Sequence, residues 1–378
     1  MDCIRKNAPC QIQTEKSLRA ARVRPPFPEP EAALPAAARM LVSFDIAAVF
    51  LYNHDRNNQP EREAEPMERQ ARIAVVGSCN VDLTVFTPVV PRGGETVLGS
   101  EFQMNVGGKG TNQATAARRA GGAVCMITRV GEDFLAGVAL AHYRSEGIST
   151  AHVRETAAAA TGTATIIVDE TSGENRIVVA SGANARISAA DVAAAEPELA
   201  QADAVLLQLE IDPLASLMAA ELAKKHGKLC ILNPAPAREI PERLLASADY
   251  VTPNETEAEF YTGIRISTIE DAFAAGERLT ALGAACAVIT LGEKGAALVR
   301  RGLRAHIPAP QVKPVDTTGA GDCFNGVLAV ALAGGAEETE AVRLACAAAS
   351  AAVQKKGAAA SCPHREEIER MRADFYGN

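Results

Sequence analysis

The sequence predicts an α/β protein in which helices cover both faces of a mostly parallel central sheet, with a second, small sheet beside it. Short apolar segments recur from Arg72 onward, and stretches with helical character separate them. This alternation is typical of parallel sheets, because a crossover between parallel strands usually contains a helix. Two regions break the alternation with strand-like segments that have no helix between them, and these predict the second sheet.

The expected strands of the central sheet are short and almost wholly apolar, as strands buried on both faces are. They occupy residues 73–76, 124–127, 204–207, 229–232, 250–251 and 287–289. The first of them runs into Gly77, as a parallel strand enters a loop at its carboxyl end. The clearest helix is expected from Pro213 to His226, since proline suits a first helical turn and Gly227 is a stop signal.

The second sheet is expected from three segments. Residues 95–102 have the character of an extended strand, and residues 163–168 and 176–179 that of a hairpin turning at 171–174. Strands from about 82–105 and 162–181 would then lie outside the main sheet. They could form a lid over a site or a dimer surface, and a plain surface hairpin is the alternative.

Residues 1–70 differ from the rest of the chain. The segment 24–30 is rich in proline and cannot be helical, and the segment 57–63 is polar without a pattern. We expect a poorly ordered extension here, followed by one domain over residues 71–375. Basic residues in the extension leave a transit-peptide role open, and Met67 is an alternative initiator.

Composition excludes several classes of function. The net charge is -8 with acidic and basic residues interspersed, so a nucleic-acid-binding surface is not expected. The chain has no run of 18 apolar residues, so we expect no membrane span. The nine cysteines include no CxxC pair, which favours buried reduced thiols in a cytoplasmic protein, with a nuclear location also open. We expect no structural zinc.

The best candidate for chemistry is the segment Asp316–Asp322, Asp-Thr-Thr-Gly-Ala-Gly-Asp. Other phosphate-binding devices are missing, since the sequence has no GxxxxGK[ST], no GxGxxG after the first strand, and no HRD or DFG triplet. A glycine turn that opens a helix presents free N–H groups and the positive end of the helix dipole to an anion. Asp322, in the first helical turn, could accept a hydroxyl proton during phosphoryl transfer. The alternative is an ordinary aspartate cap.

Other polar residues predict a site at one edge of the sheet. Gly107 to Asn112 form a second glycine turn that opens a helix and carries Lys109. Several acidic and amide side chains follow predicted strands, at the carboxyl ends where α/β proteins place their sites. They are Asn80, Asp82, Glu210, Asn254 and Glu257. Helix or strand capping explains each of these singly, but not all five together.

These segments together resemble the ribokinase branch of the PfkB carbohydrate kinase family, over about residues 72–370. The turn at 107–112 resembles the first signature of the family, and Asp316–Asp322 resembles the second. The stretches Asn-Pro-Ala-Pro-Ala at 233–237 and Thr-Pro-Asn-Glu-Thr-Glu-Ala-Glu at 252–259 resemble sequences of that branch. The resemblance implies a ribokinase-like fold, which is a three-layer αβα arrangement with a small β-sheet lid.

The resemblance also implies an activity, the ATP-dependent phosphorylation of D-ribose at its 5-hydroxyl to give ribose 5-phosphate and ADP. Asp322 would be the general base, and Gly319, Ala320 and Gly321 the anion hole for the transferring group. The pentose hydroxyls would be held by Asn80, Val81, Asp82, Gly108, Lys109, Gly110, Thr111, Asn112, Glu210 and Asp322. ATP would lie along Asn254, Thr290, Leu291, Gly292, Glu293, Lys294, Gly295, Gly321, Asp322 and Cys346.

Two cations and a dimer are further implications of the resemblance. Magnesium would bridge the ATP phosphates, with Glu257 acting on it mainly through water. A monovalent cation, K⁺, would be held by Asp316, Thr318, Ala352, Lys355, Gly357 and Ser361. Relatives pair as homodimers through their lid strands. A kinase of the same family that acts on fructose or adenosine is the alternative, and a non-catalytic sugar-binding regulator is another.

Overall fold

The computed structural model describes residues 69–377 of the 378-residue chain. The expected N-terminal extension, with Met67 and the basic residues before it, therefore lies outside the described residues except for its last two positions. No helix within residues 69–377 is both long enough and apolar enough to span a membrane. All structural statements below concern this described part of the chain.

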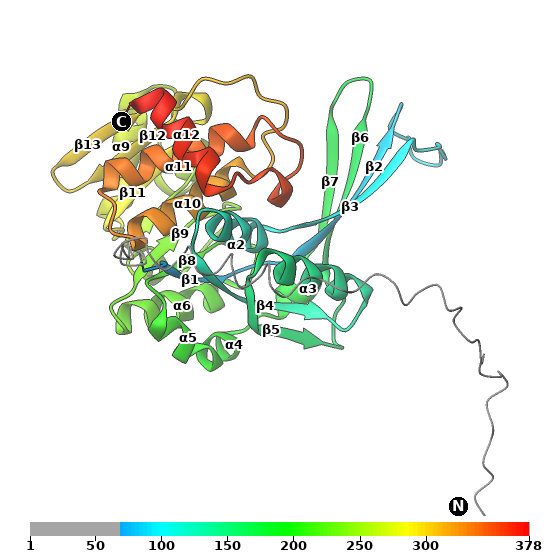
Figure 1. Cartoon of the computed structure of the whole chain (residues 1–378), viewed down its shortest axis with the longest axis horizontal. Helices are drawn as coiled ribbons and strands as arrows, with labels where there is room; N and C mark the ends of the chain where they lie inside the picture. Colours follow the sequence, from blue (N-terminus) through cyan, green and yellow to red (C-terminus); the bar gives the residue numbers. More distant parts are fainter. Residues whose placement is uncertain (1–68, 378) are drawn as a thin grey trace, which may run out of the picture. The chain divides into compact units, whose positions relative to one another are not determined.

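A nine-stranded sheet forms the centre of the described domain (Figure 1). Its strand order is β13-β12-β11-β10-β9-β8-β1-β4-β5. The strands from β10 and β11 across to β5 pair in parallel, whereas β12 and β13 are antiparallel additions at one edge. In chain order they are β1 (Arg72–Val76), β4 (Ala123–Gly131), β5 (Ser149–Thr156), β8 (Ala204–Leu207), β9 (Leu229–Leu232), β10 (Tyr250–Val251), β11 (Cys286–Thr290), β12 (Ala296–Arg300) and β13 (Leu303–Ile307).

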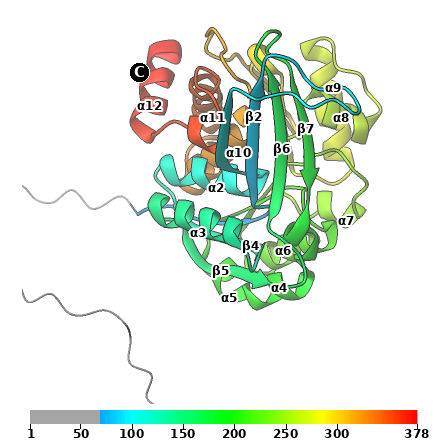
Figure 2. The same cartoon turned by 90° about the vertical axis from the view of Figure 1, so that its right-hand side faces the viewer.

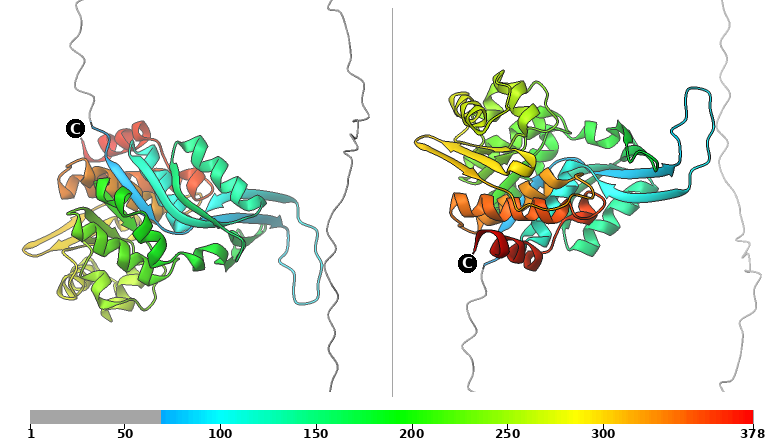
Figure 3. Two further views of the ribbon diagram at one scale, coloured as in Figure 1. Left: turned by 90° about the horizontal axis from the view of Figure 1, so that it is seen from below. Right: turned by 90° about the horizontal axis from the view of Figure 1, so that it is seen from above.

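Helices cover both faces of this sheet, as Figure 3 shows from below and from above. One layer packs α4, α5, α6, α7, α8 and α9, and the other packs α2, α3, α10, α11 and α12. Their bounds are α2 (Lys109–Arg119), α3 (Phe134–Glu146), α4 (Ala189–Ala194), α5 (Glu196–Gln201), α6 (Pro213–Lys225), α7 (Glu242–Leu245), α8 (Glu255–Thr262), α9 (Ile269–Ala281), α10 (Ala320–Ala333), α11 (Glu338–Ala352) and α12 (Arg365–Tyr376). Three 3-10 turns are η2 (Gly182–Arg186), η3 (Gly292–Lys294) and η4 (Ala359–Ser361).

The core follows from the side-chain alternation along each strand. In β1, Ile73 and Val75 face the cluster that includes α2, α10 and α11, while Ala74 and Val76 face the cluster that includes α6 and α9. All four side chains are buried. A strand with apolar residues on both faces can only be stable between two helical layers, which is the arrangement that the sequence predicts.

The second sheet has four strands in the order β3-β2-β6-β7 and is seen with β2, β6 and β7 side by side in Figure 2. These strands are β2 (Asn80–Thr87), β3 (Glu101–Gly107), β6 (Gly162–Asp169) and β7 (Asn175–Ala180). The β2–β3 and β6–β7 pairs are antiparallel, and β2 and β6 are parallel. The predicted hairpin at 163–179 is thus confirmed. We call this four-stranded sheet the lid sheet.

The strand predicted at 95–102 is wrong in its position, since β3 begins at Glu101 and runs to Gly107. Pro88 and Pro91 follow β2 and have no N–H to donate, so the β2 pairing ends at Thr87. Of residues 95–100, Ser100 alone hydrogen-bonds to β2, its N–H donating to the Phe86 carbonyl oxygen at 2.9 Å. Residues 80–82, expected directly after the first strand, form the start of β2.

The seven cysteines of the described part of the chain are buried and free. Six of them were expected to be buried from their apolar contexts, and this is confirmed; the seventh is Cys362. Burial raises the pKa of Cys125 to about 11 and those of Cys286 and Cys346 to about 12, which keeps these thiols protonated.

Candidate active site

The first glycine turn joins the lid sheet to the central domain. Gly107 ends β3, and Gly108, with φ of 85°, is the N-cap of α2. A Cβ on Gly107 would lie 2.2 Å from an Asp82 carboxylate oxygen, and one on Gly110 would lie 2.6 Å from the backbone of Ser78. Glycine is therefore required for α2 to begin this close to the residues that follow β1.

Asn80 and Asp82 are positioned by the pairing of β2 with β3, in which Asn80 lies opposite Gly107. The Asn80 side chain is buried, and its carbonyl oxygen accepts a hydrogen bond of 2.8 Å from the Asn184 amide. Glu210 lies close by, because its carboxylate accepts hydrogen bonds from the Ser78 hydroxyl at 2.5 Å and from the Lys109 backbone N–H at 2.9 Å. The expected sugar-binding carboxylates thus meet at the start of α2.

Two of the predicted sugar-site residues use their side chains elsewhere. Val81 is fully buried. The Thr111 hydroxyl is buried between the Ser78 carbonyl oxygen, to which it donates at 3.3 Å, and the Tyr143 hydroxyl at 2.8 Å. A role for either residue toward a sugar would therefore be limited to its backbone.

Asp322 brings the two glycine turns together. It lies in the first turn of α10 and is buried. One carboxylate oxygen accepts a hydrogen bond of 2.9 Å from the Asn112 amide, and the other accepts one of 3.0 Å from the Gln113 amide. The side-chain amide oxygen of Asn112, Oδ1, is buried and has no hydrogen-bond partner among residues 69–377. It is therefore an acceptor that a substrate hydroxyl could satisfy.

The electrostatics of this edge are dominated by carboxylates around one lysine. The charge of Asp322 is the largest cause that raises the pKa of Lys109; Glu210 and Glu257 act in the same direction, and burial opposes them. Burial, together with the charge of Glu210, raises the pKa of Asp82 to about 6. The Lys109 ammonium is thus kept charged by the carboxylates around it, while Asp82 is partly protonated near pH 6.

The second glycine turn opens α10. Gly319 is the N-cap with φ of 78°, and no side chain caps the helix there. A Cβ at Gly319 would lie 2.9 Å from the Cα of Ala358, so the turn packs directly against the C-terminal loop. The Ala320 N–H donates a long hydrogen bond of 3.3 Å to the Thr317 carbonyl oxygen, whereas the N–H groups of Gly319 and Gly321 donate to no backbone oxygen of the described residues. The latter two fit the anion-binding role expected of this turn.

A cavity of about 610 Å³ adjoins this turn. Seven of the residues expected at the ATP site line it, namely Asn254, Thr290, Gly292, Glu293, Gly295, Gly321 and Cys346, whereas Asp322 does not. Leu291 is buried and Lys294 exposed, and neither lines the cavity. The sequence analysis missed the wall formed by Ala309, Pro310, Gln311, Val312 and Pro314. A proline-rich segment just before Asp316 is the signal that could have indicated it.

Asn254 and Glu257 have a structural role as well. The Asn254 side chain accepts from the Glu257 N–H, and one Glu257 carboxylate oxygen accepts from the Asn254 N–H at 2.9 Å, which makes a capping box for α8. The second carboxylate oxygen keeps its acceptor capacity. Burial raises the pKa of Glu257, although the Asn254 N–H and Lys109 oppose the shift. This carboxylate, with the 610 Å³ cavity beside Asn254, fits an ion that retains most of its waters.

The residues expected at the monovalent cation lie near the same turn. The Asp316 carboxylate accepts hydrogen bonds of 2.9 Å from the N–H groups of Thr318 and Gly357. Burial opposes ionisation of Asp316, but these hydrogen bonds and the charge of Lys356 lower its pKa overall. An ionised carboxylate among backbone carbonyls is a donor set that suits a hard cation.

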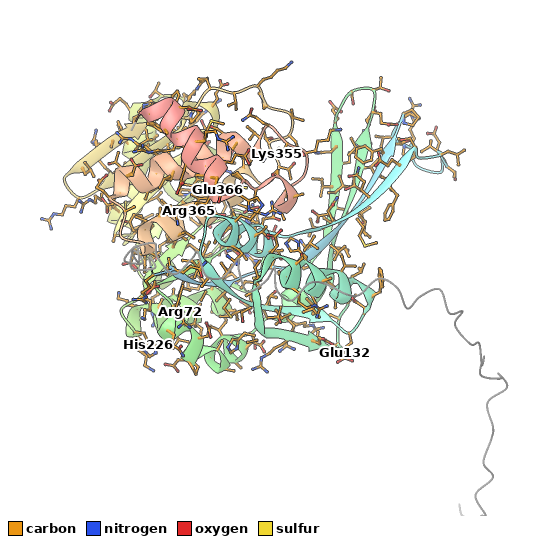
Figure 4. All side chains as sticks on the ribbon, in the orientation of Figure 1. Arg72, Glu132, His226, Lys355, Arg365 and Glu366 are labelled. Carbon is orange, nitrogen blue, oxygen red and sulfur yellow. The ribbon has the colours of Figure 1, made fainter. Side chains whose placement is uncertain are left out.

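The remaining residues of that set belong to the segment that joins α11 to α12. Ser361 is buried and donates to the Ala358 carbonyl oxygen at 2.8 Å, and the Lys355 N–H donates to Ala352. The Lys355 side chain, labelled in Figure 4, forms an ion pair with Glu367 at 2.6 Å. Its ammonium is therefore directed to α12, and only its backbone oxygen remains for a cation.

Comparison with known proteins gives a consistent result. Residues 70–365 match the pfkB family of carbohydrate kinases. The chain is 41% identical to the ribokinase of Haemophilus influenzae over 296 residues, which are 78% of this chain and 96% of that protein. It is 38% identical to the deoxyribokinase of Salmonella typhi over 297 residues, 78% of this chain and 97% of that protein.

A solved structure shares the fold. The structure of Arabidopsis thaliana ribokinase complexed with ribose and ATP is similar to this one with a TM-score of 0.74 and 34% identity. The match covers 80% of this chain and 99% of that one.

Proposed function

The chain belongs to the pfkB family of carbohydrate kinases, and from this premise we propose that it transfers the γ-phosphoryl group of ATP to the 5-hydroxyl of D-ribose. One observation carries the proposal. The Asp322 carboxylate is held by Asn112 from the first glycine turn and lies one residue from Gly321 at the nucleotide cavity. A base that contacts the polar residues of the first glycine turn and directly follows a residue lining the cavity suits direct transfer between two bound substrates.

The proposed reaction uses the side chains as follows. Asp82, Glu210 and the free oxygen of Asn112 accept hydrogen bonds from ribose hydroxyls, and Lys109 donates one. Asp322 takes the proton of the ribose 5-hydroxyl while the oxygen of that hydroxyl forms a bond to the γ-phosphorus. The bond from that phosphorus to the β-phosphate oxygen breaks, and ADP leaves. The N–H groups of Gly319, Ala320 and Gly321 face the charge on the transferring group.

Two cations complete the proposal. Magnesium would neutralise charge on the ATP phosphates, and Glu257 would hold its waters. K⁺ would bind the ionised Asp316 and backbone oxygens of the C-terminal loop. Because Gly319 packs against Ala358, a cation in that loop would fix the turn that forms the anion hole.

The lid sheet supports a proposal for assembly. Val178 on β7 is 71% exposed, and Phe102 on β3 is 57% exposed. Exposed apolar side chains that gather on one small sheet typically mark an interaction surface. We propose a cytoplasmic homodimer that pairs through these strands.

A panel of acceptors tests the proposed substrate. The rate of ADP formation is measured with D-ribose, 2-deoxyribose, fructose and adenosine, each with and without K⁺. We expect ribose to be the best substrate by kcat/KM, with a lower rate when K⁺ is omitted. Deoxyribose is the most informative competitor because of the similarity to a deoxyribokinase. A higher kcat/KM for deoxyribose would transfer the assignment to that sugar, and activity with adenosine alone would contradict the assignment to a pentose.

A further inference from the structure

We propose that Gln113 is a positioning residue that orients the catalytic base Asp322, and that it acts through a buried chain of side-chain amides. This inference rests on the proposed function, since it assigns Asp322 the role of base. Gln113 has no exposed surface and lies in α2, one residue after Asn112. It therefore cannot contact a sugar directly, and its contacts are all with protein atoms.

The contacts of Gln113 fix the plane of the Asp322 carboxylate. The Gln113 amide nitrogen donates to Oδ1 of Asp322 at 3.0 Å, while Asn112 donates to Oδ2 at 2.9 Å. With a donor on each oxygen, the carboxylate cannot rotate about its Cβ–Cγ bond without losing a hydrogen bond. Each oxygen still has a lone pair for a substrate proton. Gln113 thus determines which direction that lone pair faces.

The orientation of the Gln113 amide is itself determined. Its nitrogen also donates to Oδ1 of Asn233 at 3.1 Å, and its oxygen accepts from the Gln208 amide at 2.7 Å. The Asn233 nitrogen donates to the carbonyl oxygen of Thr252 at 2.9 Å, which leaves only its oxygen to face Gln113. A flipped Gln113 would direct an oxygen at the carboxylate and at Asn233 and would lose all three hydrogen bonds.

The amide chain is anchored in the central sheet. Gln208, Asn233 and Thr252 are the first residues after the neighbouring strands β8, β9 and β10, and all three are buried. Parallel strands end at the same edge of a sheet, so these three side chains form a row under α2 and α10. A rigid sheet edge is a firm base for a side chain that must hold a catalytic group.

A second branch of the chain returns to α10. The Thr252 hydroxyl donates to the Asn325 oxygen at 2.5 Å, and the Asn325 nitrogen donates to the carbonyl oxygen of Gly321 at 2.7 Å. Gly321 immediately precedes Asp322. The side chain of the base and the backbone before it are therefore held by the same row of residues.

Gln208 fits beside Gly77 because glycine has no side chain there. The side-chain amide oxygen of Gln208, Oε1, is buried without a hydrogen-bond partner among the described residues, and a Cβ at Gly77 would lie 1.9 Å from it. An unpaired buried acceptor costs about 1–3 kcal/mol. The Gln208 amide nitrogen nonetheless donates to the Gln113 oxygen, so this hydrogen bond holds Gln113 in its orientation although the Gln208 oxygen stays unpaired.

The test uses two substitutions of Gln113, each made in the unmodified enzyme and in the Asp322→Asn enzyme, which has no base. Gln113→Met keeps the volume but removes the donor, and Gln113→Glu keeps the shape but faces Asp322 with a second carboxylate. We expect each to lower kcat by about 10- to 100-fold, the effect of a misplaced catalytic group. The KM for ribose and the dissociation constant of ribose, measured by calorimetry, should change by less than about twofold, because Gln113 contacts no substrate.

The decisive comparison is Gln113→Met in the Asp322→Asn background. If Gln113 acts through the base, Gln113→Met should lower the residual kcat of the Asp322→Asn enzyme by no more than about twofold. An equal loss in both backgrounds would show a purely structural role and overturn the proposal, as would an unchanged kcat of Gln113→Met. If the Met variant does not fold, Gln113→Glu supplies the same comparison.

Thr115→Val is the matched control. Thr115 is fully buried on the same helix, and its hydroxyl donates to the Thr111 carbonyl oxygen without contacting Asp322. The kcat of Thr115→Val should equal that of the unmodified enzyme. A loss of kcat in Thr115→Val as large as that in the Gln113 variants would contradict a specific role for Gln113. The comparison is independent of the sugar, since it can be made with whichever acceptor the panel identifies. Failure of the ribose assignment is therefore distinguishable from failure of the Gln113 proposal.

Discussion

At the scale of single residues, the proposed sugar site contains two carboxylates that oppose each other. Asp82 is largely buried and feels the charge of Glu210, which together raise its pKa to about 6. Hydrogen bonds from sugar hydroxyls favour the ionised form of a carboxylate. Ribose affinity should therefore fall as the pH decreases through about 6 and Asp82 becomes protonated.

This pH dependence gives a test of the Asp82 environment. The dissociation constant of ribose is measured by calorimetry between pH 5 and pH 8, a range of about three units around that pKa. Glu210→Gln removes the second cause of the shift, so the midpoint of the acid limb should move to lower pH, although ribose also binds more weakly. Asp82→Asn should abolish the fall in ribose affinity at low pH. A midpoint that stays in place in Glu210→Gln would contradict the proposed coupling.

The charged residues of the site could be predicted from the sequence, but the uncharged residues that hydrogen-bond to them could not. Asp322 and Glu210 stand out because several such polar residues follow predicted strands or glycine turns at one edge of the sheet, although each could be a cap by itself. Gln113, Asn233 and Asn325 carry no charge, and a buried amide has the same appearance in a sequence as an exposed one. Their role depends on partners about 70 to 210 positions away, such as Asp322 for Gln113, which no local pattern indicates.

At the scale of elements, the strands that sequence predicted well are those buried on both faces. Residues 204–207, 229–232 and 250–251 coincide with β8, β9 and β10. The two edge strands β5 and β13 were not predicted, because they mix polar and apolar residues. β12 was also not predicted, although it lies inside the sheet and four of its five residues are buried. The position of β3 was wrong for a different reason. All but one of its residues are exposed or half-buried, so the apolar pattern does not mark it, and its register is set by pairing with β2.

At the scale of the whole described domain, the lid sheet is the part whose surface suits a partner. All six residues of β7 are exposed, including Ile177, Val178 and Val179. A sheet with an exposed apolar edge is prone to pair with another chain. We therefore expect the enzyme to sediment as a dimer of 39.5-kDa chains.

Sedimentation velocity checks this expectation with two charge substitutions. Val178→Glu should shift the enzyme toward the monomer, since a carboxylate would be placed in the proposed apolar interface. Leu214→Glu is the control, because Leu214 is 57% exposed on α6, outside the lid sheet, and should leave the dimer intact. A monomeric unmodified enzyme, or equal dissociation of both variants, would contradict pairing through the lid strands.

The central claim is that Asp322 is the base in the phosphorylation of ribose, and the most direct measurement pairs turnover with binding in Asp322→Asn. ADP formation with ribose is followed in a coupled assay, and ribose binding to the same preparation by calorimetry. The variant should lose about 10²- to 10⁴-fold in kcat, the usual contribution of a general base, while ribose binding is preserved. Near-normal turnover in Asp322→Asn would contradict the assignment.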